Sequence, residues 1–178
     1  MPYPFTSQAP ESRSYTGVGI SRDAKLYVYG SVPGEPGEVQ PAVIGCPNHV
    51  EIREMAATSE YGKRSYLLLF LDSPTGDESG NLVLRVPIGY TKPNGDFQLS
   101  GPTRSLLAAL LLRQPSWRAV KIFATRGTKA NFLDVIPLDA NLEPMEQVRT
   151  TLIPPNRESA VQAVCDINNA LRSSATHA

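Results

Sequence analysis

The feature that most constrains this chain is a series of short segments in which side chains of two kinds alternate, each segment ended by proline or glycine. The clearest runs over 63–72 and is dense in leucine and aromatic residues. A period of two is typical of a β-strand with two different faces, and proline and glycine favour turns. Such a chain must bury one face of a sheet, so the pattern predicts a β-rich domain.

Five further segments are predicted to be strands like 63–72. The strands predicted along the chain are 23–30, 50–58, 63–72 and 82–90, followed by a hairpin of 118–126 and 130–138. Tight turns are expected at 59–62, 74–81, 92–95 and 127–129, and the first strands form a β-meander. Residues 31–48 contain four prolines and three glycines, which predicts a long loop because proline lacks the N–H that a sheet needs.

Two segments have the 3.6-residue period of helices instead. Residues 104–113 are rich in leucine and alanine, and the preceding 100–103 supply capping and first-turn residues. Near the end, Val161, Val164, Ile167 and Leu171 recur at helical spacing, which predicts an amphipathic helix over about 157–171.

The order of these elements suggests a fold class. A helix placed before the final hairpin of a five-stranded β domain is the plan of the OB-fold, a small Greek-key barrel. We therefore predict a β-rich α+β protein with an OB-like five-stranded barrel, an inserted helix and a C-terminal helix, although other arrangements fit the same order. The expected parts are a flexible N-terminal arm (1–14), the barrel domain (15–142), and a linker with the C-terminal helix (143–178).

Composition limits the classes of function. Lys+Arg and Asp+Glu number 17 each, so recognition of a polyanion must come from local clustering of charge. No apolar run approaches the roughly 18–20 residues that span a bilayer, and the N-terminus lacks a signal-peptide pattern. We expect a cytoplasmic protein that does not enter membranes, in which Cys46 and Cys165 are free thiols, the alternative being a disulfide between them.

Sequence motifs of catalysis are missing. The chain contains no GxSxG, HExxH, GxxxxGK[ST] or GxGxxG sequence, and its carboxylates show no spacing that singles out a pair. Cys46 and His49 could form a thiol–imidazole or metal pair, but the alternative is two residues of a proline- and glycine-rich loop. We expect no enzyme activity, no cofactor and no metal, while noting that active sites are assembled in space rather than in sequence.

The candidate site is instead a strand face that mixes aromatic and basic residues opposite an aliphatic face. Alternation places Lys25 with Tyr27 and Tyr29, and Lys121 with Phe123. The residues predicted to bind a ligand are Lys25, Tyr27, Tyr29, Arg64, Tyr66, Phe70, Arg85, Lys121, Phe123, Arg126 and Lys129.

Such a face suits single-stranded nucleic acid, because bases stack on aromatic rings while Lys and Arg meet the phosphates. The alternative is ordinary packing, since Tyr and Phe are β-formers and a strand can be buried on both faces. Trp117, which follows the first helix, is expected to close the barrel end rather than to stack on a base.

Residues from about 49 to 139 resemble the OB-fold single-stranded DNA-binding proteins. The resemblance is carried by the strand 63–70, the helix near 106–112 and the hairpin ending at 131–135. It implies sequence-tolerant binding of single strands, DNA more than RNA, in replication, recombination or a mobile element, often by an oligomer. The last residues, 172–178, contain no acidic side chain, unlike the acidic tail of bacterial members, which puts that route of partner recruitment in doubt.

Two other hypotheses stay open. The chain could be a protein-interaction or assembly module, which the net charge of zero favours, or an enzyme whose site the sequence does not reveal. The clustering of Lys25, Arg64, Lys121, Arg126 and Lys129 favours the nucleic-acid hypothesis.

Overall fold

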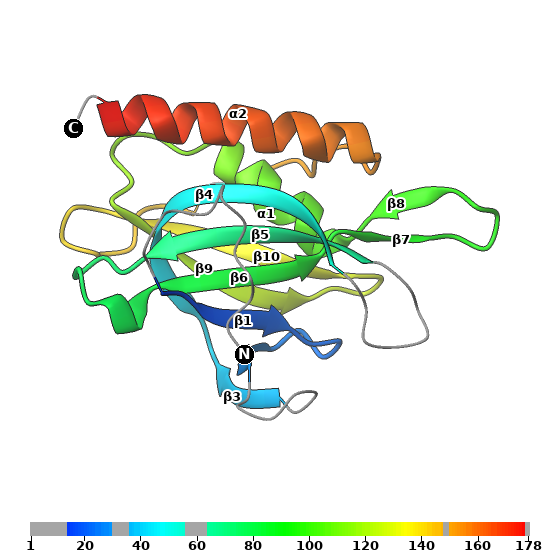
Figure 1. The fold of residues 1–178 in the computed structure, drawn as a ribbon, viewed down its shortest axis with the longest axis horizontal. Helices are drawn as coiled ribbons and strands as arrows, with labels where there is room; N and C mark the ends of the chain where they lie inside the picture. Colours follow the sequence, from blue (N-terminus) through cyan, green and yellow to red (C-terminus); the bar gives the residue numbers. More distant parts are fainter. Residues whose placement is uncertain (1–13, 30–35, 56–63, 148–149, 177–178) are drawn as a thin grey trace.

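The computed structural model describes residues 14–29, 36–55, 64–147 and 150–176 (Figure 1). In chain order the elements are β1 (Thr16–Ile20), β2 (Leu26–Tyr29), β3 (Pro36–Gln40), β4 (Val43–Met55), β5 (Arg64–Asp72), the 3₁₀ turn η1 (Glu78–Gly80), β6 (Leu82–Pro87), β7 (Gly89–Thr91), β8 (Phe97–Leu99), α1 (Gly101–Leu111), β9 (Ala119–Arg126), β10 (Asn131–Leu138) and α2 (Arg157–Thr176). The predicted β-rich α+β class is confirmed, as are both predicted helices.

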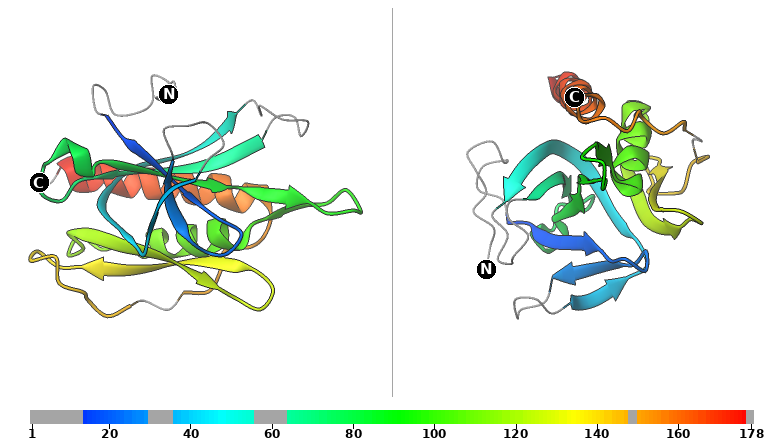
Figure 2. Two further views of the ribbon diagram at one scale, coloured as in Figure 1. Left: turned by 90° about the horizontal axis from the view of Figure 1, so that it is seen from below. Right: turned by 90° about the vertical axis from the view of Figure 1, so that its right-hand side faces the viewer.

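Eight of the strands form one mixed sheet in the order β10-β9-β4-β5-β6-β1-β2-β3, and β7 pairs with β8 in a separate hairpin. The chain runs through β4, β5 and β6, and β9 then returns to lie beside β4, which is the spatial order of a Greek key. All neighbouring strands are antiparallel except β1 and β6, which are parallel. The sheet is strongly curled, so that β9 and β10 form a wall facing β5 and β6 (Figure 2).

The curl arises at β4, because this strand pairs with strands of both walls. Residues 43–45 pair with β9, whereas the rest of the strand pairs with β5, with a bulge between Pro47 and His49. A bulge bends a strand and increases its twist, and at Gly45 a side chain would press on Leu71 of β5. The bend therefore turns one long strand from one wall into the other.

The hydrophobic core fills the space between the walls. Leu67, Leu69 and Leu71 of β5 and Val120 and Ile122 of β9 are fully buried. These are the aliphatic faces predicted from alternation, and their burial is confirmed. Alternation works here because each strand has one face against the core.

Helix α1 lies between the two walls and supplies further core residues, among them Leu106 and Leu107 (Figure 2). It begins after Ser100, whose hydroxyl accepts from the Thr103 N–H, so the predicted capping role of this residue is confirmed. Thr103 and all residues from 105 to 110 are buried, so this helix is enclosed on every side over its central turns. Trp117, which follows it, is buried in the same core, as expected.

Helix α2 packs on β4 and α1 (Figure 1) and adds Ala160, Ala163 and Ile167 to the core. It also satisfies the backbone of β4. The Asn168 Oδ1 accepts from the Val50 N–H at 2.9 Å, and its Nδ2 donates to the Val50 carbonyl at 2.7 Å. One buried amide thus replaces the strand that β4 lacks on this side.

The predicted loop over 31–48 is wrong, because β3 and the first part of β4 lie in it. The prolines stand where a sheet tolerates them: Pro36 begins β3, Pro41 lies between the strands, and Pro47 is at the bulge. β1, with glycine at two of its five positions, was not predicted. The segment 82–90 is two strands rather than one, since β6 ends at Pro87 and β7 starts at Gly89.

The remaining boundaries differ from the predictions by a few residues. β2 starts at Leu26, so Lys25 precedes it, and α2 continues to Thr176. The turn predicted at 92–95 is confirmed by the Gly95 N–H, which donates to the Lys92 carbonyl at 2.9 Å with a Gly95 φ of 92°. The predicted N-terminal arm lies outside the described residues apart from Ser14.

Candidate functional site

A row of aromatic and basic side chains crosses the outer face of β5, β6 and β2. The Arg85 guanidinium carbon lies 4.4 Å from the centre of the Tyr66 ring and 4.8 Å from that of Tyr29. The Tyr29 ring meets Tyr27 edge to face, with centroids 5.6 Å apart. We call Tyr27, Tyr29, Tyr66 and Arg85 the tyrosine–arginine row.

The register of the sheet explains how the row forms. Arg85 of β6 is opposite Leu68 on one side and Gly19 of β1 on the other, and Gly19 is in turn opposite Tyr27 of β2. Since β1 lies between β6 and β2, its side chains would separate Arg85 from the β2 tyrosines. Glycine at both outward positions of β1 removes that obstacle.

Gly17 and Gly19 are therefore part of the site. A Cβ on Gly17 would overlap the Tyr29 ring, and one on Gly19 would lie 2.8 Å from the Tyr27 hydroxyl oxygen. Val18 between them points into the core and is fully buried. The role of this glycine pair was not predicted from the sequence. The sequence signal for this role is a pair of glycines on either side of an apolar residue, close to a strand with alternating tyrosines.

All four side chains of the row are half-buried, neither covered by the core nor fully in solvent. Rings and guanidinium cover one another, which is a favourable cation–π arrangement.

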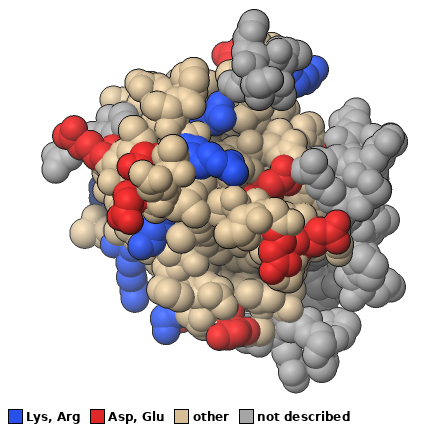
Figure 3. Space-filling model, turned by 90° about the vertical axis from the view of Figure 1, so that its left-hand side faces the viewer, with Lys and Arg blue, Asp and Glu red and all other residues tan. Residues whose placement is uncertain are grey.

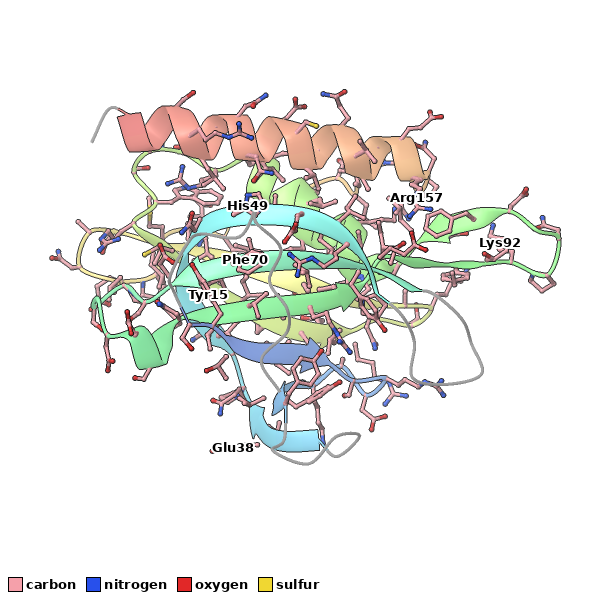
Figure 4. All side chains as sticks on the ribbon, in the orientation of Figure 1. Tyr15, Glu38, His49, Phe70, Lys92 and Arg157 are labelled. Carbon is pink, nitrogen blue, oxygen red and sulfur yellow. The ribbon has the colours of Figure 1, made fainter. Side chains whose placement is uncertain are left out.

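Other predicted residues of the same strands are placed differently. Phe70 is fully buried on this face, with Tyr15 packed edge-on at 5.2 Å and His49 tilted against it at 5.8 Å (Figure 4). Lys25 is exposed in the turn before β2. Arg64 begins β5, and its side chain lies outside what the structure describes.

The basic and aromatic residues of β9 are on the opposite wall (Figure 2). Lys121 and Phe123 are half-buried on the side of β9 that faces away from Val120 and Ile122, whereas Arg126 is exposed at the end of the strand. Lys129 lies in the β9–β10 turn. The structure thus brings Tyr27, Tyr29, Tyr66 and Arg85 together, and it does not bring the β9 residues to them.

Beside Phe70, polar groups gather around Asp72. The Tyr15 hydroxyl donates to Asp72 Oδ1 and the Asn48 amide donates to Oδ2, each at 2.9 Å.

Burial lowers the pKa of His49, and the cations Arg172 and Arg53 lower it further against the opposing effect of Glu51. The bulge thus holds a neutral imidazole against a buried ring.

Cys46 has a different environment from His49, although three positions separate them. Its sulfur accepts from Nη1 of Arg118 at 3.1 Å, and burial raises the pKa of the thiol despite that cation. Cys46 and Cys165 are not joined by a disulfide. Within the described ranges, no three His, Cys, Asp or Glu side chains gather closely enough to hold a metal ion.

Charge is mixed on the face that Figure 3 shows. On the end of the molecule in Figure 3, Lys and Arg side chains are interspersed with Asp and Glu, as the formal net charge of zero suggests. Among the described helices, none has the length and apolar character to cross a membrane. Any attraction for an anion must therefore arise at particular groups such as Arg85.

Comparison with known proteins identifies no relative: no family model matches the chain, and neither a curated protein nor a solved structure matches it.

Proposed function

We propose that this protein binds single-stranded nucleic acid, DNA in preference to RNA, through the tyrosine–arginine row, and that it binds rather than catalyses. The observation that carries the proposal is the position of Arg85 between the rings of Tyr66 and Tyr29 on an outer sheet face. Three rings and a cation in one line offer both kinds of contact that a single strand needs.

The chemistry of each group supports this ligand. Unpaired bases stack on aromatic rings with little sequence preference, at roughly 1–3 kcal/mol per base. The guanidinium carbon of Arg85 lies 4.4 Å and 4.8 Å from the centres of the Tyr66 and Tyr29 rings, and a guanidinium can bind phosphate oxygens in a bidentate way. Because Gly17 and Gly19 have no side chains, the tyrosine rings lie close to the backbone of β1. A single strand of nucleic acid can therefore cross β6, β1 and β2 without meeting a side chain of β1.

The topology supports an OB-like barrel as part of the proposal. β4, β5 and β6 are followed by the β7–β8 hairpin, then by α1 and the β9–β10 hairpin, and a helix before a final hairpin is consistent with the OB-fold plan. In this interpretation β1, β2 and β3 extend the barrel and contribute Tyr27 and Tyr29 to the row. An oligomeric state and a role in replication or recombination rest on the resemblance of the sequence, whereas the cytoplasmic location we propose rests on its composition.

A second candidate is a protein-interaction module, and one observation favours it. β3 is an edge strand of the sheet, and its Val39 side chain is 54% exposed. An edge strand can pair with a strand of another chain. This candidate needs no cation, so binding to a protein would be insensitive to Arg85.

Fluorescence anisotropy with labelled oligo-dT at two salt concentrations tests the proposal. Affinity should fall as salt rises, because phosphate contacts release counterions. Tyr29→Ala should weaken binding by about 5- to 150-fold, the loss of one stacked base. Phe123→Ala is the matched control, since this aromatic residue lies on the opposite wall.

Arg85→Gln separates charge from stacking. It should weaken binding and make the salt dependence shallower by about 0.7 in the logarithmic slope, the value for one phosphate contact to a single strand. Absence of binding at low salt, or an equal loss in Phe123→Ala and Tyr29→Ala, would refute the proposed site.

A further inference from the structure

We propose that a second site, a cleft at the end of the barrel, binds a phosphorylated nucleoside. The cleft has a volume of about 680 Å³. It lies where the β1–β2 turn, the start of α1, the β7–β8 hairpin and the β9–β10 turn come together, at the end of the molecule that the right panel of Figure 2 faces. A volume of this size is ordinary for a small-molecule site.

Three cations line the cleft, one from each of three segments: Arg22, Arg104 and Lys129. No Asp or Glu is among its lining residues. The Nε of Arg104 donates to the Ile153 carbonyl at 2.7 Å, which holds this guanidinium in place. In the described part of the chain, the side chains of Arg22 and Lys129 have no hydrogen-bonding or ion-pair partner, so the positive charge of the cleft is not compensated there. Phosphate groups are the anions that such a cluster of Arg and Lys recognises.

An aromatic ring stands beside these cations. Tyr90 of β7 lines the cleft and is 53% exposed, and Phe132 of β10 forms another part of its wall. An exposed ring offers a base a surface on which to stack, and inorganic phosphate alone would leave it uncovered. In a phosphorylated nucleoside, the phosphate would lie at the three cations and the base, joined to it through the sugar, would cover the Tyr90 ring.

The start of α1 adds to this environment without carrying the proposal. Ser100, Gly101 and Pro102 line the cleft, and the positive end of the helix dipole favours a nearby anion. A Cβ on Gly101 would collide with the Asn131 carbonyl oxygen, so close contact between α1 and β10 shapes this wall.

The cleft and the tyrosine–arginine row share no residue, so either site can fail without the other. The phosphorylated nucleoside could come from two sources: a free nucleotide, or the 5′-phosphorylated end of a strand. The chemistry at the three cations is the same for both.

Isothermal titration calorimetry with ADP at low and high salt tests the cleft, with adenosine and inorganic phosphate titrated separately. ADP should bind more tightly than either part, and its affinity should fall with salt. The double variant Arg22→Ala/Lys129→Ala should weaken ADP binding at least roughly tenfold, since each residue makes a charge-assisted contact, and both side chains are exposed enough for the fold to survive their loss. Lys92→Ala is the control, because this exposed lysine of the β7–β8 hairpin does not line the cleft (Figure 4).

Tyr90→Ser should weaken ADP binding and leave phosphate binding unchanged, whereas Tyr29→Ala of the row should leave ADP binding unchanged. Preference for 5′-phosphorylated oligo-dT over the same unphosphorylated strand assigns the ligand to a strand end; equal affinity for the two assigns it to free nucleotides. No ADP binding at low salt, equal losses in Lys92→Ala and the double variant, or adenosine or phosphate binding as tightly as ADP would overturn the proposal. None of these results affects oligo-dT binding at the row.

Discussion

The amide of Asn168 offers the sharpest test of how the fold is held together. It is the buried α2 side chain that bonds both the N–H and the carbonyl of Val50 on β4. Asn168→Ala removes both bonds at once. The change leaves a buried donor and a buried acceptor on the backbone of a core strand.

The magnitude follows from these two groups. A buried polar group left unsatisfied costs about 1–3 kcal/mol, so two of them cost about 2–6 kcal/mol. For a chain of this length each kcal/mol lowers the melting midpoint by roughly 2–4 °C, which gives a decrease of roughly 4–24 °C. Water entering the space left by the amide reduces the effect toward the lower limit.

Urea unfolding followed by circular dichroism measures the free energy, with Asn169→Ala as the control. Asn169 is the next residue of α2 and is exposed, so its replacement should change stability by less than about 0.5 kcal/mol. Equal stability of the two variants would refute the conclusion that Asn168 replaces a strand beside β4.

Asn168→Asp tests the same contact through pH. An ionised carboxylate can accept from the Val50 N–H, but its other oxygen then faces the Val50 carbonyl oxygen, and neither atom can donate a hydrogen bond. A protonated carboxyl can donate to the Val50 carbonyl. Burial would raise the pKa of this group above its unfolded value of about 3.9. The native state then binds more protons, so the variant should lose stability relative to the wild type as pH rises above about 4. A difference that does not change with pH would contradict this account.

Three further predictions concern the row and the bulge of β4. Gly17→Val should displace the Tyr29 ring and destabilise the protein by about 1–3 kcal/mol in urea unfolding; an unchanged midpoint would contradict the packing of the ring on β1. NMR titration should give His49 a pKa below 6.5, because burial disfavours the imidazolium, so stability should fall as pH drops through and below that value; a pKa at or above 6.5 would contradict it. At pH 8, iodoacetamide should alkylate the exposed Cys165 before Cys46, whose pKa is raised by burial; the reverse order in peptide mass spectrometry would show that Cys46 is not protected.

Local patterns predicted the strands whose two faces differ. In β9 alternate residues meet the core, so sequence alternation follows burial at Val120 and Ile122, whereas in β5 Leu68 and Phe70 on the other face are buried as well. Composition gave a wrong prediction where the geometry of a strand accommodates proline. Residues 36–40 form a strand despite Pro36, because the first residue of an edge strand needs no ladder donor.

The candidate site could be predicted only in part, for a reason of topology. Alternation correctly separated Tyr27 and Tyr29 from the core side of β2, but pairing between strands far apart in sequence decides which faces adjoin. The parallel placement of β1 beside β6 brings the β2 tyrosines to Arg85. The curl of the sheet carries Phe123 to the other wall, although it lies on the outer face as well (Figure 2).

Photocrosslinking of an oligonucleotide containing 5-iododeoxyuridine, with the crosslinked residues located by mass spectrometry, tests the central claim most directly. A base stacked on the row places its crosslinks at Tyr27, Tyr29 or Tyr66, and excess unlabelled oligo-dT should suppress them. Crosslinks at Phe123 instead of these tyrosines, or none at all under conditions in which the strand is in excess, would contradict the claim that the tyrosine–arginine row binds single strands.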